Sequence, residues 1–256
     1  MSHRHTLLII TILLLAAGLC ATANAQNGNG NGNGFDRIPN RFQSQLGALG
    51  NRGKKDGKQK TVYTGRLFIK GGESKSVRII HQLPNLVRLE GFKSGNAHIS
   101  FDGERAYGVA SRKEESYLET FVMDTIEGML SAMQSAAAIR FLGSNFGPDP
   151  AKFPDYTGPR FDIIDVTDTV RCKREKVLQP KLYFVNSGTG ILYSTRYTDR
   201  SLNPAVRKET HFSVWGTIDG SSYPARIDHY ENGELEFTFI AEEITAEPST
   251  DIEDFR

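Results

Sequence analysis

Hydrophobic and polar residues alternate through two long stretches of the chain, and this pattern predicts two sets of β-strands. The first set covers residues 61–110, where Tyr63, Leu67 and Ile69 share one face. The second set covers residues 160–245 and contains hairpin turns at 186–190 and 231–234. A period of two sends successive side chains to opposite faces, so each set is expected to bury one face. Strands joined by such short turns favour an antiparallel sheet.

The period becomes helical between the two strand sets. Apolar residues from Tyr117 to Phe141 fall mostly on one face, alanines favour helix, and Gly143 is placed to end it. We therefore predict one main helix over residues 114–142, with Gly128 as a point where it could divide. The proline-rich stretch 147–159 is predicted to be a loop.

These elements predict an α+β domain over residues 61–245. About nine to eleven strands are expected, and an antiparallel sheet of that length curls instead of staying flat. We expect a strongly curved antiparallel sheet wrapped around the one main helix, because one face of each needs a cover. The acidic residues of 246–256 are expected to form a solvated tail.

The first 25 residues have the pattern of an export signal. Arg4 precedes an apolar run over 6–18, and Ala23 and Ala25 are small residues at the positions that a signal peptidase reads. The run is too short and too early to be a stable membrane span. We predict cleavage after Ala25 and a soluble, periplasmic protein.

Acylation of Cys20 is the alternative to a cleaved signal. A lipoprotein signal has a small residue immediately before its cysteine, whereas Leu19 occupies that position here. Cleavage after Ala25 is therefore favoured, and it leaves Cys172 as the one cysteine, with no intramolecular disulfide. About 200 ordered residues can bury a sufficient core without disulfides.

Residues 26–60 are predicted to join the signal to the domain. Residues 27–34 are four Asn-Gly repeats, which have no apolar side chains to bury and should act as a linker. A short amphipathic helix is expected next, because apolar residues recur at helical spacing, and polar residues follow it. Those apolar residues are Ile38, Phe42, Leu46 and Leu49.

The overall charge is close to neutral, with 31 basic and 30 acidic side chains. This balance argues against a dedicated nucleic-acid-binding protein, which normally has a strong basic excess. A basic stretch over 52–60 is interpreted as a solvated segment. Peripheral contact with an anionic membrane surface is the alternative interpretation.

Several short motifs, in their order along the chain, resemble the LolA/LolB-like periplasmic lipoprotein-carrier superfamily. They are Tyr-Thr-Gly-Arg-Leu at 63–67, Leu-Pro-Asn-Leu-Val-Arg-Leu-Glu at 83–90, and Ile-Ser-Phe-Asp-Gly at 99–103. The end of the domain is similar too, at 218–220, 223–227 and 232–233. The Asn-Gly linker and the stretch 147–159 depart from the pattern. The resemblance implies an unclosed β-barrel, lined with apolar side chains and covered by helices, that holds acyl chains.

We predict from the resemblance and the apolar strand faces that a pocket binds a lipid or the acyl chains of a lipoprotein. Flexible methionines suit such a ligand, and each buried CH₂ is worth about 0.8 kcal/mol. Arg66 or Arg88 is expected to meet a head-group at the rim. The predicted lining is Tyr63, Leu67, Ile69, Val87, Leu89, Ile99 and Phe101 from the sheet, with Phe121, Met129 and Met133 from the helix.

No catalytic or metal-binding pattern is recognisable in the sequence. The histidines at 81, 98, 211 and 229 form no spaced pair, and Cys172 has no evident histidine partner. We therefore predict a non-enzymatic carrier or sensor of the cell envelope, without a cofactor or metal. The alternative is a structural or interaction protein with a fully packed interior. The sequence leaves the ligand and the oligomeric state open.

Overall fold

The computed structural model describes residues 38–40, 42–44, 59–83, 85–93, 97–148, 155, 157–170, 177–218 and 221–256. The predicted signal peptide, the Asn-Gly linker and both cysteines lie outside these residues. Contacts divide the chain into two units, 1–32 with 147–158 and 33–146 with 159–256. Every helix and strand with assigned bounds belongs to the second unit.

Twelve antiparallel strands form one continuous sheet, which confirms the predicted architecture and slightly exceeds the predicted strand number. Both predicted hairpins are present, at 186–190 and 231–234. The first strands are β1 (Gln59–Ile69), β2 (Ser74–Gln82), β3 (Leu86–Glu90), β4 (His98–Asp102) and β5 (Ala106–Tyr107). The others are β6 (Ala138–Phe146), β7 (Phe161–Val170), β8 (Val177–Asn186), β9 (Leu192–Asp199), β10 (Val206–Ile218), β11 (Ser221–Glu231) and β12 (Glu234–Pro248).

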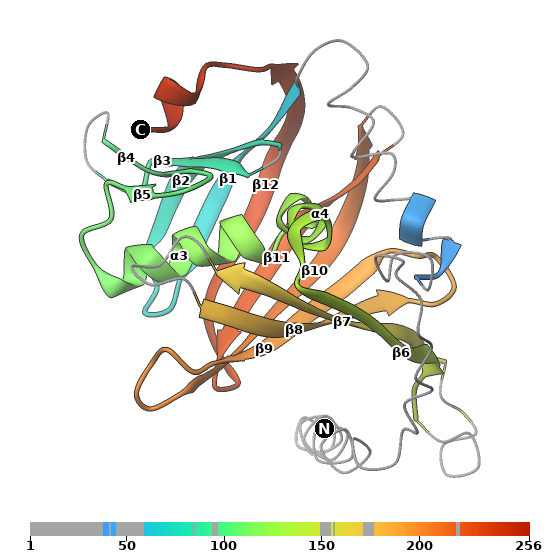
Figure 1. Cartoon of the computed structure of the whole chain (residues 1–256). Helices are drawn as coiled ribbons and strands as arrows, with labels where there is room; N and C mark the ends of the chain where they lie inside the picture. The colour runs from blue at the N-terminus through green and yellow to red at the C-terminus, as the bar shows by residue number, and fades with distance from the viewer. Residues whose placement is uncertain are drawn as a thin grey trace. The chain divides into compact units, whose positions relative to one another are not determined.

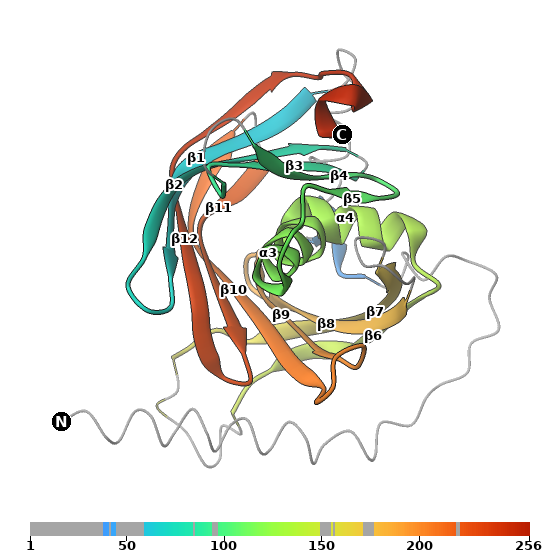
Figure 2. The same cartoon turned by 90° about the vertical axis from the view of Figure 1, so that its left-hand side faces the viewer.

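The strand order places the helices on the concave face of the sheet. β1 to β5 run outward to one edge, β6 begins at the opposite edge, and β1 pairs with β12 where the two series meet. The chain between β5 and β6 must therefore cross from edge to edge. It does so as α3 (Arg112–Met123) and α4 (Ile126–Ser135), and the sheet curves around both (Figures 1 and 2).

The prediction of one helix over 114–142 was wrong in two respects. α3 ends at Met123, and Asp124 is its C-terminal cap. α4 begins after Thr125, whose hydroxyl accepts a hydrogen bond from the Gly128 N–H. Gly128 does not divide the helix but permits the close turn, because a Cβ there would lie 2.3 Å from the Val122 carbonyl oxygen. Residues 138–146 form β6, since pairing with β7 overrides the helix propensity of the nearby alanines.

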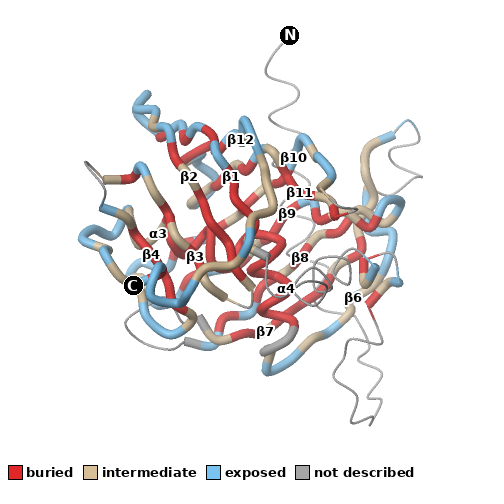
Figure 3. The backbone as a smooth tube through the Cα atoms, turned by 90° about the horizontal axis from the view of Figure 1, so that it is seen from above, coloured by how far each residue is buried: buried red, intermediate tan, exposed pale blue. Residues whose placement is uncertain are grey.

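The hydrophobic core lies between the concave face and the helices, and Figure 3 shows buried residues concentrated in the strands around them. Ile38 and Phe42, from the predicted short helix, are buried in this core. Residues 40 and 42–44 are helical, while Leu46 and Leu49 lie outside the described residues. Among the helices of the described part of the chain, none combines the length and apolar character needed to cross a bilayer.

The expected acidic tail packs against the domain. β12 continues to Pro248, and a 3₁₀ helix, η3 (Ile252–Phe255), follows it. Phe255 is buried against Val62 and Ile80, and its neighbour Arg256 forms an ion pair with Asp102. Burial of the Phe255 side chain therefore holds this segment against the sheet although its neighbours are charged. This end of the chain is part of the folded unit.

Gly65→Ala is expected to lower the free energy of unfolding by about 1–3 kcal/mol, the usual cost of overpacking. Gly65 adjoins a register shift between β1 and β12, where an added Cβ would lie 2.1 Å from the Ile240 carbonyl oxygen. The backbone of β12 would have to move. Urea unfolding measures the effect, and Gly216→Ala is the control, because nothing lies within 4 Å of its Cβ position. Equal effects of the two substitutions would contradict this explanation.

Candidate functional site

The ten residues predicted to line a pocket come together in one buried cluster between the sheet and the helices. Their side chains are 0 to 5% exposed, and those of Leu67, Ile99 and Met129 are fully inaccessible. A space wide enough for an acyl chain would also admit water and would leave its lining exposed. Around these three residues the helices therefore fill the interior in this conformation. Ligand contact by the ten residues stays a prediction.

The two arginines expected at a rim form ion pairs within the sheet. Arg66 is 59% exposed and forms an ion pair with Glu242, its neighbour on β12. Arg88 forms an ion pair with Glu90 and donates a hydrogen bond to the Asp254 carbonyl oxygen near the C-terminus. Both side chains alternate with the buried strand residues and so belong to the outer face of the sheet. Contact of these arginines with a head-group stays a prediction.

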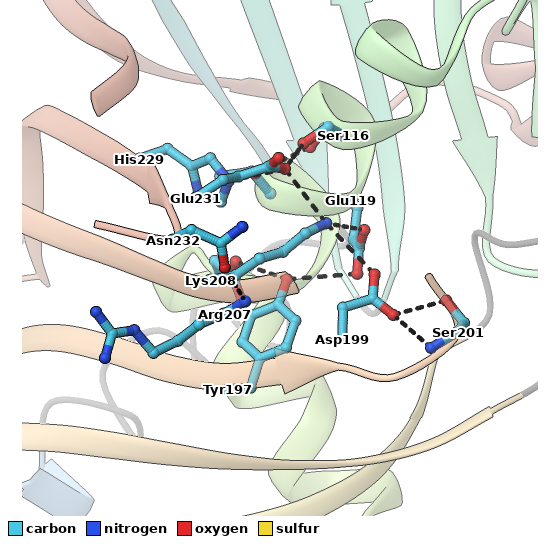
Figure 4. Close-up of polar contacts among 12 residues, drawn as sticks. Ser116, Glu119, Tyr197, Asp199, Ser201, Arg207, Lys208, His229, Glu231 and Asn232 are labelled. Atoms are coloured by element: carbon cyan, nitrogen blue, oxygen red, sulfur yellow. Dashed lines mark hydrogen bonds and ion pairs between the residues drawn. The ribbon is translucent and has the colours of Figure 1, made fainter. Parts of the chain in front are cut away.

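Sequence reasoning missed a cluster of buried charges beneath α3, which we call the lysine cluster: Lys181, Lys208, Glu119, Asp124, Asp199 and Glu231. Lys208 reaches from β10 toward α3, with its Nζ 2.7 Å from Glu119 Oε2, 3.6 Å from Asp199 Oδ2 and 3.9 Å from Glu231 Oε1 (Figure 4). Burial alone would lower the pKa of Lys208. The three carboxylates outweigh it, and the pKa is raised.

The same cluster holds the end of α3. Asp124, the C-terminal cap, accepts a hydrogen bond from Lys181 at 2.5 Å and is completely buried. The hydroxyls of Tyr197 and Thr210 each lie 3.3 Å from its second oxygen. Strands β8, β9 and β10 therefore all contact one carboxylate, so the junction between α3 and α4 is fixed to the sheet.

His229 and Glu231 extend this polar region onto β11. The His229 Nδ1 lies 3.0 Å from the Thr210 hydroxyl, and its Nε2 lies 3.9 Å from Glu231 Oε1. Together with Lys208 and the Ser116 hydroxyl, His229 lowers the pKa of Glu231 to about 2. The polar region under α3 is thus a connected set of charges and hydroxyls.

A second polar group lies beneath α4. The Tyr63 hydroxyl on β1 donates to Glu127 Oε1 on α4 at 3.0 Å. The Tyr63 ring meets the His81 ring of β2 edge-on, with 5.9 Å between centroids. Burial lowers the pKa of His81, against the opposite effect of the Glu127 charge. The imidazole is therefore neutral near neutral pH, and can donate one hydrogen bond and accept another.

Neither polar region has the arrangement of a metal centre. Within the described ranges, no group of three or more His, Cys, Asp or Glu side chains is placed to hold a metal ion. The lysine cluster joins the helix to the sheet through its own contacts. α3 thus contacts both apolar residues and the lysine cluster, through Phe121 against Phe237 and through Glu119 against Lys208. The buried side chains of α4 are mostly apolar.

Solved structures from several bacteria are similar to this chain. A LolA superfamily protein from Nitrosomonas europaea matches with a TM-score of 0.53 at 11% identity. An outer membrane lipoprotein-sorting protein domain from Vibrio parahaemolyticus (0.48, 8%) and a DUF1329 family protein from Desulfovibrio piger (0.45, 11%) are also similar. Each match covers 84% of this chain and 97% of the other. No family model and no curated protein matches the chain. The likeness shows the fold, a LolA-like open barrel with helices.

Proposed function

We propose that this protein is an exported, non-enzymatic carrier that binds the acyl chain of a lipid or lipidated protein between the sheet and α4. The observation that carries this proposal is the unequal attachment of the two helices. Among the described residues α4 has no ion pair with the sheet, whereas α3 is joined to the sheet by buried ion pairs.

The contacts of α4 support its role as the movable cover. Its polar attachments include the Tyr63–Glu127 hydrogen bond and a hydrogen bond from Ser131 to Asn85, in the connection between β2 and β3. Its buried face is otherwise apolar and includes Met129 and Met133. Methionine adapts its shape at little cost, so the same surface can meet either the sheet or a flexible chain.

The free energy gained by burying an acyl chain is large enough to offset the contacts that these side chains lose. Burying about 14 methylene groups is worth on the order of 11 kcal/mol. Moving α4 outward loses the burial of a few apolar side chains, each worth about 1.5–3 kcal/mol. A long acyl chain can therefore offset the displacement of one short helix, while the ion pairs of α3 stay in place.

The predicted export signal and the LolA-like fold support a periplasmic site of action. The resemblance of the strand motifs to the lipoprotein-carrier superfamily supports acyl chains as the ligand. The second candidate function is that of an interaction protein of the cell envelope with a permanently packed interior. The inaccessible side chains at the centre of the core favour that alternative.

Lipid content and lipid uptake test the proposal directly. Protein expressed in a bacterial periplasm and purified without detergent is expected to carry a co-purifying lipid in native mass spectrometry. After delipidation, a fluorescent fatty acid should bind saturably at one site and be displaced by unlabelled lipid. Protein that holds no lipid and takes up no fluorescent fatty acid would leave the interaction-protein alternative.

A further inference from the structure

Among the buried polar atoms without a hydrogen-bond partner in the described part of the chain, two adjoin Tyr63 beneath α4. They are Nε2 of His81 and Oε2 of Glu127. Their side chains are 4% exposed in both cases, and each belongs to a group that adjoins the Tyr63 ring or hydroxyl. A buried polar atom without a partner costs about 1–3 kcal/mol, so this arrangement calls for an additional group.

We propose that His81 and Glu127 form a polar subsite for the amide group of an N-acylated ligand. The inference rests on the proposed function and names the chemical class of its ligand. The neutral imidazole donates from Nε2 to the amide carbonyl oxygen, and the Glu127 carboxylate accepts the amide N–H. One ligand group thereby satisfies both buried atoms, while the acyl chain continues between the sheet and α4.

The chemistry of the pair distinguishes an amide from the other linkages of acyl chains. An ester has a carbonyl oxygen but no N–H, so Oε2 of Glu127 would stay unpaired. A fatty acid carboxylate would place a second negative charge beside Glu127, which is unfavourable in a buried site. The aromatic rings of Tyr223 and Phe239 lie 6.1 and 6.5 Å from that of Tyr63, and they provide apolar surface next to the subsite.

The pair also lies where it survives the movement of α4. Glu127 is in the first turn of this helix, next to the Asp124–Thr125 junction that Lys181 holds to the sheet. When α4 pivots about its first turn, its C-terminal end moves farthest from the sheet. The Tyr63–Glu127 hydrogen bond can therefore persist while Met133, near the other end, moves away.

The test compares two neutral ligands of equal chain length, N-methyldodecanamide and methyl dodecanoate. Their dissociation constants are measured by displacement of a neutral probe, the methyl ester of a fluorescent fatty acid. The wild-type protein is expected to bind the amide about tenfold more tightly than the ester. Glu127→Met removes the acceptor of the amide N–H, so it should bring this ratio near one and change ester binding little. His81→Leu removes the donor to the carbonyl oxygen that both ligands have, so it should weaken both. The control is Tyr117→Phe, which removes another unpaired buried oxygen next to Phe92 and Phe237 and should leave the ratio unchanged.

The outcomes separate the subsite from the carrier function. Equal binding of amide and ester by the wild-type protein overturns the subsite alone. Equal weakening of both ligands by Glu127→Met also overturns it, because the carboxylate then has only a structural role. Binding of neither ligand overturns the carrier function as well. Circular dichroism verifies folding, and if Glu127→Met fails to fold, the ratio for the wild-type protein carries the comparison.

Discussion

Lys208→Met is expected to lower the free energy of unfolding by about 3–5 kcal/mol, the usual cost of removing one partner from a buried ion pair. The substitution keeps an unbranched side chain of similar length but removes an ammonium that lies 2.7 Å from Glu119 Oε2 and 3.6 Å from Asp199 Oδ2. Both carboxylates would then stay buried without this ion pair. Urea unfolding, followed by the fluorescence of the single tryptophan, Trp215, measures the loss.

Two comparisons make this expectation specific to the lysine cluster. Lys70→Met removes an exposed lysine that contacts Glu234 and Glu236, and it should cost at most about 1 kcal/mol. Glu119→Leu should cost less in the Lys208→Met protein than in the wild-type protein, because part of its effect is the loss of Lys208. A cost of Lys208→Met no larger than that of Lys70→Met would show that the cluster contributes little to stability.

Joining α4 to the sheet is expected to reduce uptake of a fluorescent fatty acid at least tenfold. Asn85→Cys and Ser131→Cys place thiols at two residues that contact each other, and a short, cleavable bismaleimide links them. Cys172→Ser and omission of the predicted signal peptide leave no competing cysteine. If α4 must move outward to admit an acyl chain, the link blocks entry, and its cleavage by a reductant restores it.

The controls for the cross-link are the two single-cysteine proteins treated with the same reagent. They carry the modification but no bridge, and they should take up the fluorescent fatty acid as the untreated protein does. Mass spectrometry establishes that the bridge has formed. Undiminished uptake by bridged protein would show that α4 is not the cover and that ligand enters elsewhere.

The sheet was predictable from sequence because its strands have clear alternation and its hairpins have recognisable turns. β6 was not, because the alanines before Ile139 favour helix locally, and only pairing with the distant β7 determines the strand. The packing of Phe255 was missed for a similar reason. Its acidic neighbours dominate the local composition, while its contacts with Val62 and Ile80 depend on the folded sheet.

The candidate site was predictable only in its apolar part. The ten apolar residues cluster as their strand faces suggested, but the lysine cluster brings together helix and strand residues far apart in sequence. One local signal was present: Lys208 and Thr210 occupy the same face of β10 as the buried Val206 and Phe212. A lysine in such a position indicates a buried partner, although the alternation cannot say which carboxylate supplies it. The position of His81 beside Tyr63 and Glu127 was not predictable either, because no sequence pattern links these residues.

The pairing of β1 with β12 has a consequence for how the protein reaches its native state. These two strands are the first and the last of the described sheet in sequence order, so neither local strand series can complete it alone. Contacts between residues so distant in sequence close slowly, because the intervening chain must first be ordered. Until β12 is in place, β1 and β11 each lack a neighbour on one side, and an open edge can pair with another molecule. Pairing of β1 and β11 with β12 is therefore the folding step before which the chain is most exposed to aggregation. A chaperone that covers these edges would act at that step.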